Sequence, residues 1–210
     1  MRRLPVYLLL DTSGSMNGEP IEAVRNGVQV LHSTLRKDPY ALESAYISVI
    51  TFDSEVKQVA PLTEVSLFQP PTIQASGGTS LGGVLKKVAE CADSEVKKST
   101  ENEKGDWRPL VFLMTDGYPT DDLQKGLAEF KKRKWGVVVA CGTDDADFGA
   151  LQQITENTVK LSQSDSASIG AFFKWVSASI ATSSKKVDSG ADNSDSMSEL
   201  PPPPPEIVLV

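Results

Sequence analysis

Apolar and polar residues follow one another in blocks along this chain, and the blocks predict strands and helices in turn. Continuous apolar runs rich in β-branched residues predict strands that are buried on both faces. Apolar residues repeated at three- and four-residue steps predict amphipathic helices. The strand-type runs are Leu4–Leu10, Tyr46–Phe52, Glu55–Ala60, Leu110–Met114, Val137–Cys141 and Val159–Leu161. The helix-type segments run from Gly18 to Asp38, from near Ser80 to Glu95, from Asp121 to Lys134, from Phe148 to Ile154 and from Ile169 to Ile180.

This alternation of strands and helices predicts an α/β fold. Its sheet is expected to be doubly wound and mainly parallel, as in Rossmann-like folds, with helices on both faces. Right-handed crossovers bring most strand carboxyl ends to one edge of such a sheet, and ligands bind there. We therefore expect the loops at Asp11, Asp53, Asp116 and Thr143–Asp145 to open at a single edge.

The composition changes after about Ser183. Residues 184–199 are polar, residues 201–205 are five prolines, and the chain continues with the apolar residues 207–210. Such a segment has too little apolar surface to fold by itself, and its prolines favour an extended polyproline II spacer. We expect one domain over residues 1–183 and a disordered polar, Pro-rich tail over 184–210. The last residues could remain without a partner, add a strand to a partner's sheet or dock as a peptide.

Composition and charge narrow the class of protein. The chain has 210 residues, 40% of them hydrophobic, which is typical of a globular, soluble protein. Its net charge of −7 argues against nucleic acid as the main partner. Cys91 and Cys141 lack metal-site or disulfide-framework spacing, which favours two free thiols in a reducing compartment. No apolar run approaches the ~20 residues of a membrane helix. We expect a cytoplasmic monomer with no membrane partner.

Three separate segments carry candidate metal ligands. The first strand ends in Asp11-Thr12-Ser13-Gly14-Ser15, with three oxygen side chains at alternate positions. Gly77-Gly78-Thr79-Ser80 offers a hydroxyl before a predicted helix, and Thr115-Asp116-Gly117 follows a predicted strand. Any one of these motifs alone is typical of an ordinary turn. Together, at matching places in an α/β pattern, they predict a site for a divalent cation that prefers oxygen ligands, formed by Asp11, Ser13, Ser15, Thr79 and Asp116.

These motifs resemble the metal-ion-dependent adhesion site (MIDAS) of the von Willebrand factor A (VWA) domain, which combines D-x-S-x-S, a distant Thr and a distant Asp. The resemblance extends from about Leu4 to Ile180. It implies six strands in the order 3-2-1-4-5-6, with a short antiparallel third strand at one edge. It also implies that the three hydroxyls coordinate the ion directly, that the two carboxylates act largely through bound water, and that a Glu or Asp of a partner protein completes the shell.

Within this family, the short length and the segment Thr115–Asp121 resemble the bacterial tellurite-resistance TerY-type proteins. That resemblance implies a bacterial stress or tellurite-resistance context, with a protein kinase and a phosphatase as partners. Mg²⁺ is the expected ion, and Mn²⁺ or Ca²⁺ are alternatives.

An enzymatic role is the main alternative. Phosphatases of the haloacid-dehalogenase type also begin with a strand followed by Asp, but they carry a second Asp where this chain has Ser13. The single histidine, His32, lies within a predicted helix beside its apolar stripe and is a poor candidate for a general base. We therefore expect no catalysis. A second alternative is a scaffold whose tail binds the partner while the metal is only structural.

Two charged segments have simpler explanations than a binding site. We interpret Lys131–Lys134 as a solvated helix end, because cations in the last turn of a helix suit its dipole. Asp144, Asp145 and Asp147 are interpreted as a helix cap in preference to a second cation site.

Overall fold

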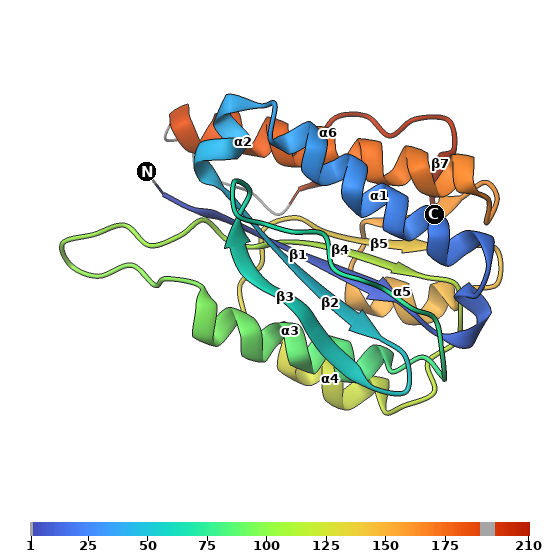
Figure 1. Cartoon of the computed structure of the whole chain (residues 1–210). Coiled ribbons are helices and arrows are strands. Elements are labelled where there is room, and N and C mark those ends of the chain that lie inside the picture. Colours follow the sequence, from blue (N-terminus) through green and yellow to red (C-terminus); the bar gives the residue numbers. More distant parts are fainter. Residues whose placement is uncertain (1, 190–195) are drawn as a thin grey trace.

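A seven-stranded sheet with helices on both faces forms the body of the protein (Figure 1). The structure is a computed structural model that describes residues 2–189 and 196–210. The strands are β1 (Leu4–Asp11), β2 (Ala45–Phe52), β3 (Val56–Glu64), β4 (Leu110–Thr115), β5 (Val138–Gly142), β6 (Thr158–Leu161) and β7 (Ile207–Leu209). The α-helices are α1 (Glu19–Leu35), α2 (Pro39–Ser44), α3 (Leu81–Glu95), α4 (Leu123–Lys131), α5 (Phe148–Ile154) and α6 (Ser166–Ser189). Two short 3-10 helices are η1 (Gly14–Met16) and η2 (Met197–Glu199).

The strand order is β3-β2-β1-β4-β5-β6-β7. Strands β2, β1, β4, β5 and β6 run parallel, while β3 and β7 lie antiparallel at the two edges. The predicted α/β class is confirmed, as are the order 3-2-1-4-5-6 and the antiparallel third strand that the family resemblance implied. The sheet has one strand more than expected. Because the five inner strands are parallel, their carboxyl ends share one edge of the sheet.

Strand β1 lies inside the sheet, between β2 and β4, and is buried along its whole length. Successive side chains of a strand point to opposite faces, so β1 contributes to two separate apolar layers. Leu8 and Leu10 belong to the layer beneath α1 and α6, whereas Tyr7 and Leu9 belong to the layer beneath α3, α4 and α5. This double burial fixes the register of β1, and therefore the position of the loop that follows it.

Several element boundaries differ from the prediction. Helix α1 ends at Leu35, before the expected stop at Asp38-Pro39. Those two residues also begin the short helix α2, which was not predicted: Asp38 Oδ1 accepts a hydrogen bond from Ala41 N at 2.9 Å, and Pro39 occupies the first turn. Helix α4 ends at Lys131 and not at Lys134, and β3 extends beyond Ala60 to Glu64.

The expected disordered tail is wrong for the described residues. Helix α6 continues past residue 183 to Ser189, and β7 pairs antiparallel with β6. The Trp175 indole N–H donates to the Pro201 carbonyl at 2.9 Å, and Ile207 is only 4% exposed. Residues 190–195 of the expected tail lie outside the described residues. Residues 196–210 are too polar to fold alone. In the structure, β6 supplies backbone hydrogen-bond partners for β7, and the apolar core buries Ile207. Residues 207–209 do add a strand, to the sheet of their own chain.

Replacing Ile207 with Ala tests this docking. The change removes buried apolar surface and should lower the free energy of unfolding by about 2 kcal/mol. Urea denaturation followed by circular dichroism measures it. Leu209→Ala is the matched control, because Leu209 lies on the same strand and is 60% exposed, and it should cost less than about 0.5 kcal/mol. Equal costs for the two variants would show that β7 does not pack as described.

Candidate metal centre

Five oxygen-bearing side chains gather at the carboxyl edge of the sheet, and three loops supply them. Asp11 ends β1, and the turn that follows carries Ser13 and Ser15 into η1. Asp116 directly follows β4, and Thr79 precedes α3. Because β1 and β4 are parallel neighbours in the sheet, the loops that follow them begin side by side.

The serine hydroxyls and the Asp116 carboxylate form one hydrogen-bonded cluster. Ser13 Oγ lies 2.9 Å from Ser15 Oγ. Ser15 Oγ donates to Asp116 Oδ1 at 2.8 Å, and Ser13 Oγ lies 3.4 Å from the same oxygen. Two loops about one hundred residues apart in the sequence are thus brought into direct contact through oxygen atoms.

Asp11 is the most deeply buried member of the set, with 1% of its surface exposed. Its Oδ1 accepts from the Ser13 backbone N–H at 2.7 Å, and its Oδ2 accepts from the Thr115 hydroxyl at 2.5 Å. Burial raises the pKa of the Asp11 carboxyl, and the hydrogen bonds from Thr115 and Ser13 partly oppose that rise. Both oxygens are therefore held by protein donors, which suits a carboxylate that positions its neighbours.

The Thr79 loop is fastened to the Asp11 loop by backbone hydrogen bonds. Ser76 N donates to Thr12 O at 2.7 Å, and Gly14 N donates to Gly77 O at 2.9 Å. Gly77 has a φ of +72°, and a Cβ there would lie 2.4 Å from Ser54 Oγ, so no other residue fits this close approach without strain.

The Thr79 hydroxyl faces the turn that carries Asp116. A Cβ placed on Gly117 would lie 3.3 Å from Thr79 Oγ1. Thr79 N also donates to Thr120 Oγ1 at 3.0 Å, and Thr120 N donates to Thr79 O at 2.9 Å. Thr79 therefore has a fixed position beside the Asp116–Gly117 turn, although no direct hydrogen bond joins it to the serine cluster.

Four residues that support the site were not assigned such a role from the sequence. Thr115 holds Asp11, and Thr120 holds Thr79. Asp121 accepts from Gly82 N at 2.9 Å and from Gly83 N at 2.6 Å, which caps the start of α3. The Thr12 hydroxyl donates to Asp53 Oδ2 at 2.9 Å. Three of them, Thr115, Thr120 and Asp121, lie in the segment Thr115–Asp121 that the sequence singled out, whereas nothing in the sequence marked Thr12.

The remaining candidates take structural roles. Asp147 Oδ1 accepts from Ala150 N at 3.0 Å and caps α5, as predicted, and Asp144 pairs with Lys160 at 2.8 Å. His32 Nε2 lies 3.1 Å from the Val65 carbonyl oxygen, and the His32 ring packs edge-on against Phe68. Among residues 2–189 and 196–210, no group of three or more His, Cys, Asp or Glu side chains could hold a metal ion.

The donor set fits a hard divalent cation. Mg²⁺, Mn²⁺ and Ca²⁺ prefer oxygen, and Ser13, Ser15 and Thr79 offer three hydroxyls beside two carboxylates. The cluster lacks the thiolates and imidazoles that softer ions select. Ser13 is buried while Ser15 is exposed, so the cluster extends from the protein interior to solvent.

Comparison with known proteins identifies the family. Residues 6–174 match the von Willebrand factor type A domain, so the chain belongs to that family, whose members are commonly metal-dependent protein-interaction modules. A protein of Synechocystis sp., itself uncharacterized, is 32% identical over 123 residues, which are 55% of this chain and 26% of the relative. The chain thus spans about a quarter of the length of this curated relative.

Solved structures share the fold. The pilus adhesin SpaC of Lactobacillus rhamnosus GG is 15% identical with a TM-score of 0.70, and the match covers 87% of this chain and 31% of the adhesin. A von Willebrand factor type A protein of Catenulispora acidiphila is 17% identical with a TM-score of 0.66, over 86% and 43% of the two chains. Proximal thread matrix protein 1 of the mussel byssus, solved with a zinc-occupied MIDAS motif, is 18% identical with a TM-score of 0.59, over 87% and 46%. These likenesses establish the fold.

Removing the Thr115 hydroxyl tests how Asp11 is held. Thr115→Val takes away the donor to Asp11 Oδ2 and should lower the free energy of unfolding by about 1–3 kcal/mol, because a buried carboxylate loses a partner. Urea denaturation measures it, with the exposed Thr72→Val as control. The cost should shrink in an Asp11→Asn background, since that background lacks the charge that the hydroxyl stabilises. If Thr115→Val lowered the free energy of unfolding equally with and without Asp11→Asn, the hydrogen bond between Thr115 and Asp11 would be contradicted.

Proposed function

We propose that this chain is a metal-dependent protein-interaction module whose bound divalent cation takes a carboxylate from a partner protein. One observation carries the proposal: Ser13 Oγ, Ser15 Oγ and Asp116 Oδ1 lie within 2.8–3.4 Å of one another at the carboxyl edge of the sheet. Membership of the von Willebrand factor type A family supports it. The named relatives include a pilus adhesin and a thread matrix protein, which favours adhesion or interaction over catalysis.

The five candidate ligands would have two different roles at the ion. Ser13, Ser15 and Thr79 would supply neutral ligands, and Asp11 and Asp116 would orient those ligands and any bound water. Neutral ligands leave the charge of a divalent ion incompletely balanced, so the bound cation would supply an electrophilic position for an anionic oxygen from outside. Mg²⁺ or Mn²⁺ is the proposed ion on the chemistry of the donors. Because the MIDAS motif of the byssus protein was found occupied by zinc, Zn²⁺ should also be included in the titration.

The proposed setting is the bacterial cytoplasm, in a stress or tellurite-resistance system with a protein kinase and a phosphatase as partners. The support is the resemblance of Thr115–Asp121 to TerY-type proteins, together with two buried and unpaired cysteines, Cys91 and Cys141. Burial raises the pKa of the Cys91 thiol to about 11, which keeps it protonated and unreactive at neutral pH. No helix in the described part of the chain is long and apolar enough to cross a membrane.

The two alternatives receive less support. A phosphatase of the haloacid-dehalogenase type needs an acid where Ser13 lies, and Ser13 is hydrogen-bonded to Ser15. A scaffold that binds through its tail would have to use residues that are packed on β6 and α6 in the described part of that tail. Only Val208, Leu209 and Val210 of the final segment are exposed apolar residues.

Removing the Ser15 hydroxyl tests the metal site with little risk to the fold, because Ser15 is exposed. Calorimetric titration with Mg²⁺, Mn²⁺ and Zn²⁺ should show one bound ion, and Ser15→Ala should weaken its affinity about tenfold or more. Asp11→Ala should have an effect at least as large. Ser33→Ala, an exposed serine on α1, should bind like the wild type. Equal affinities in all four proteins would rule out the assigned site.

Partner capture tests whether the ion is the recognition element. Affinity purification from the native cell should retain a protein partner with the wild type and lose it in the presence of a chelator. Ser15→Ala should lose the same partner without a chelator, because it acts on the ion alone. Ile207→Ala, which loosens β7, should retain it. Capture that survives chelation and Ser15→Ala but disappears with Ile207→Ala would instead favour the tail scaffold.

A further inference from the structure

The loops at the carboxyl edge of the sheet are acidic. Nine Asp or Glu residues and no Lys or Arg occur in the five connections that leave the carboxyl ends of the parallel strands. These connections, which we call the acidic loops, are residues 12–18, 53–55, 116–122, 143–147 and 162–165. The whole chain has 28 acidic and 21 basic residues, so its excess of negative charge is concentrated around the candidate metal centre.

Hydrogen bonds join the acidic loops directly to the residues of the metal centre. Asp53 Oδ2 accepts from the Thr12 hydroxyl at 2.9 Å. The backbone N–H of Asp147 donates to the Gly117 carbonyl at 3.3 Å. Thr12 and Gly117 each adjoin a candidate ligand in the sequence. The carboxylates therefore surround the candidate metal centre, and a partner that reaches the ion must approach through them.

Most of this negative charge is not neutralised by the protein itself. Three of the nine carboxylates form ion pairs, which are Glu55–Lys57, Asp122–Lys125 and Asp144–Lys160. Within residues 2–189 and 196–210, the other six have no ion-pair partner. Some of them accept backbone hydrogen bonds at the start of a helix, as Asp165 does from Ser168 N at 2.8 Å. That bond lowers the pKa of Asp165, so this carboxylate stays charged at neutral pH.

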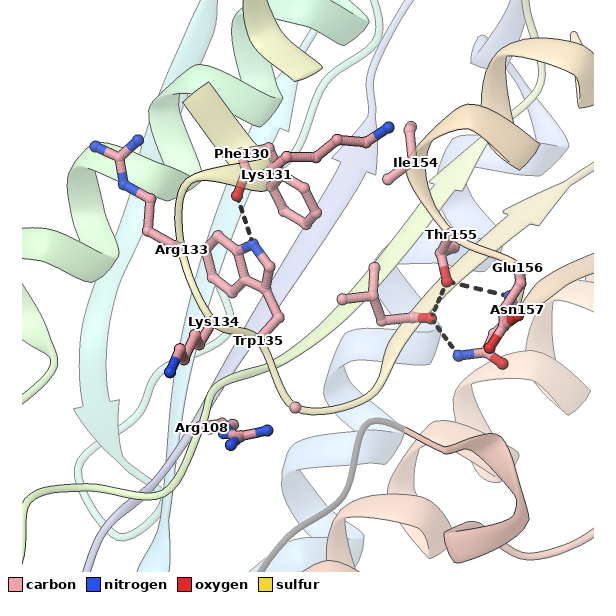
Figure 2. Close-up of a pocket in the computed structure, with 12 residues that line it drawn as sticks. Arg108, Phe130, Lys131, Arg133, Lys134, Trp135, Ile154, Thr155, Glu156 and Asn157 are labelled. Carbon is pink, nitrogen blue, oxygen red and sulfur yellow. Dashed lines mark hydrogen bonds between the residues drawn. The ribbon is translucent and has the colours of Figure 1, made fainter. Parts of the chain in front are cut away.

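Several exposed cationic residues lie at the opposite edge of the sheet, where the strands begin. Figure 2 shows Arg108, Lys131 and Lys134 near Trp135, and the charged ends of Lys131 and Arg108 point apart. The 8 residues of β1 alone span roughly 26 Å, well beyond the screening length of about 8 Å at physiological ionic strength. These cations therefore do not offset the charge that a partner meets at the acidic loops.

Tyr118 places an exposed aromatic ring beside the candidate metal centre. It is 66% exposed and lies two residues after Asp116, a backbone distance of at most about 7 Å. The Gly117 carbonyl and the Thr120 N–H, on either side of it, both form backbone hydrogen bonds, at 3.3 and 2.9 Å. Pro119 restricts the backbone of the residue before it. Tyr118 is therefore held in solvent at a fixed place next to a candidate ligand.

An aromatic ring within an acidic surface favours a cationic partner group. The face of a tyrosine ring attracts Lys and Arg side chains, and tyrosine is enriched among the residues that dominate binding energy at interfaces. No other ring or cation of the described part of the chain lies against the Tyr118 ring. The acidic loops would attract a basic surface and repel an acidic one.

We propose that the partner of the metal centre is a basic protein surface that carries a single Asp or Glu. Its carboxylate would bind the ion, and an Arg or Lys beside that carboxylate would lie over the Tyr118 ring. Further basic residues of the partner would face the acidic loops. This inference rests on the proposed function and specifies the kind of partner that the metal centre takes. The ion selects the acid, while the acidic loops and Tyr118 select its surroundings.

Calorimetric titration of the full chain with synthetic peptides, in excess Mg²⁺ or Mn²⁺, tests the proposal. Four peptides of one length with blocked ends differ only at the centre, which is Glu flanked by Gly, Glu flanked by Arg, Glu flanked by Asp, or Gln flanked by Arg. The Arg-flanked Glu peptide should bind about tenfold more tightly than the Gly-flanked one, and the Asp-flanked peptide most weakly. Raised salt should reduce this preference. The Gln peptide should bind more weakly than its Glu counterpart, and a chelator should abolish that difference.

Two exposed tyrosines provide the matched variants. Tyr118→Ala should weaken binding of the Arg-flanked Glu peptide about threefold, because the contact between ring and cation is lost. It should leave the affinities for the Gly-flanked peptide and for the ion unchanged. Tyr118→Phe keeps the ring and should bind like the wild type. Tyr40→Ala removes an exposed tyrosine from the start of α2, near the opposite edge of the sheet, and should also bind like the wild type.

The outcomes separate this inference from the proposed function. Equal affinities for the Gly-flanked and Arg-flanked Glu peptides would overturn the inference and leave the proposed function intact. So would equal effects of Tyr118→Ala and Tyr40→Ala. If the Gln peptide bound as tightly as its Glu counterpart, the acidic loops would attract cations without help from the ion, and the inference would again fail. If no Glu peptide bound to the chain with its ion in place, the proposed function would fail as well.

Discussion

The burial of the Asp11 carboxylate at the end of β1 is the constraint on which the carboxyl edge depends. A carboxylate removed from water must be held by donors, and here Ser13 N–H and the Thr115 hydroxyl hold its two oxygens at 2.7 and 2.5 Å. The bond from Ser13 fixes the turn after β1, and the bond from Thr115 joins the end of β1 to the end of β4. The serine hydroxyls are consequently aimed at Asp116, so the geometry of the whole cluster follows from satisfying one buried charge.

A cluster made chiefly of hydroxyls has a consequence for recognition. Side chains such as Ser13 and Ser15 bring oxygen atoms but no charge, unlike the three or more acids of a typical carboxylate site. Such a site would hold a divalent ion without neutralising it. Recognition of an external carboxylate would break no covalent bond and would need no catalytic base. The single histidine, His32, lies beside Val65 and Phe68.

The two edges of the sheet differ in the side chains that they present. The carboxyl edge gathers oxygen donors around Asp11 and Asp116, while the amino edge carries the exposed cationic residues Arg108, Lys131 and Lys134 near Trp135. Parallel strands separate these two surfaces by the length of the sheet.

The sequence by itself determined the α/β class, the alternating elements and the five candidate ligands, because buried parallel strands and amphipathic helices leave periodic patterns. Asp11, Ser13 and Ser15 could be placed because they follow a strand directly. Only the tertiary structure decided that residues 196–210 dock on β6 and α6, and that Thr115 holds Asp11 while Thr120 holds Thr79. Both outcomes depend on contacts between residues far apart in the sequence, which the local composition does not reveal.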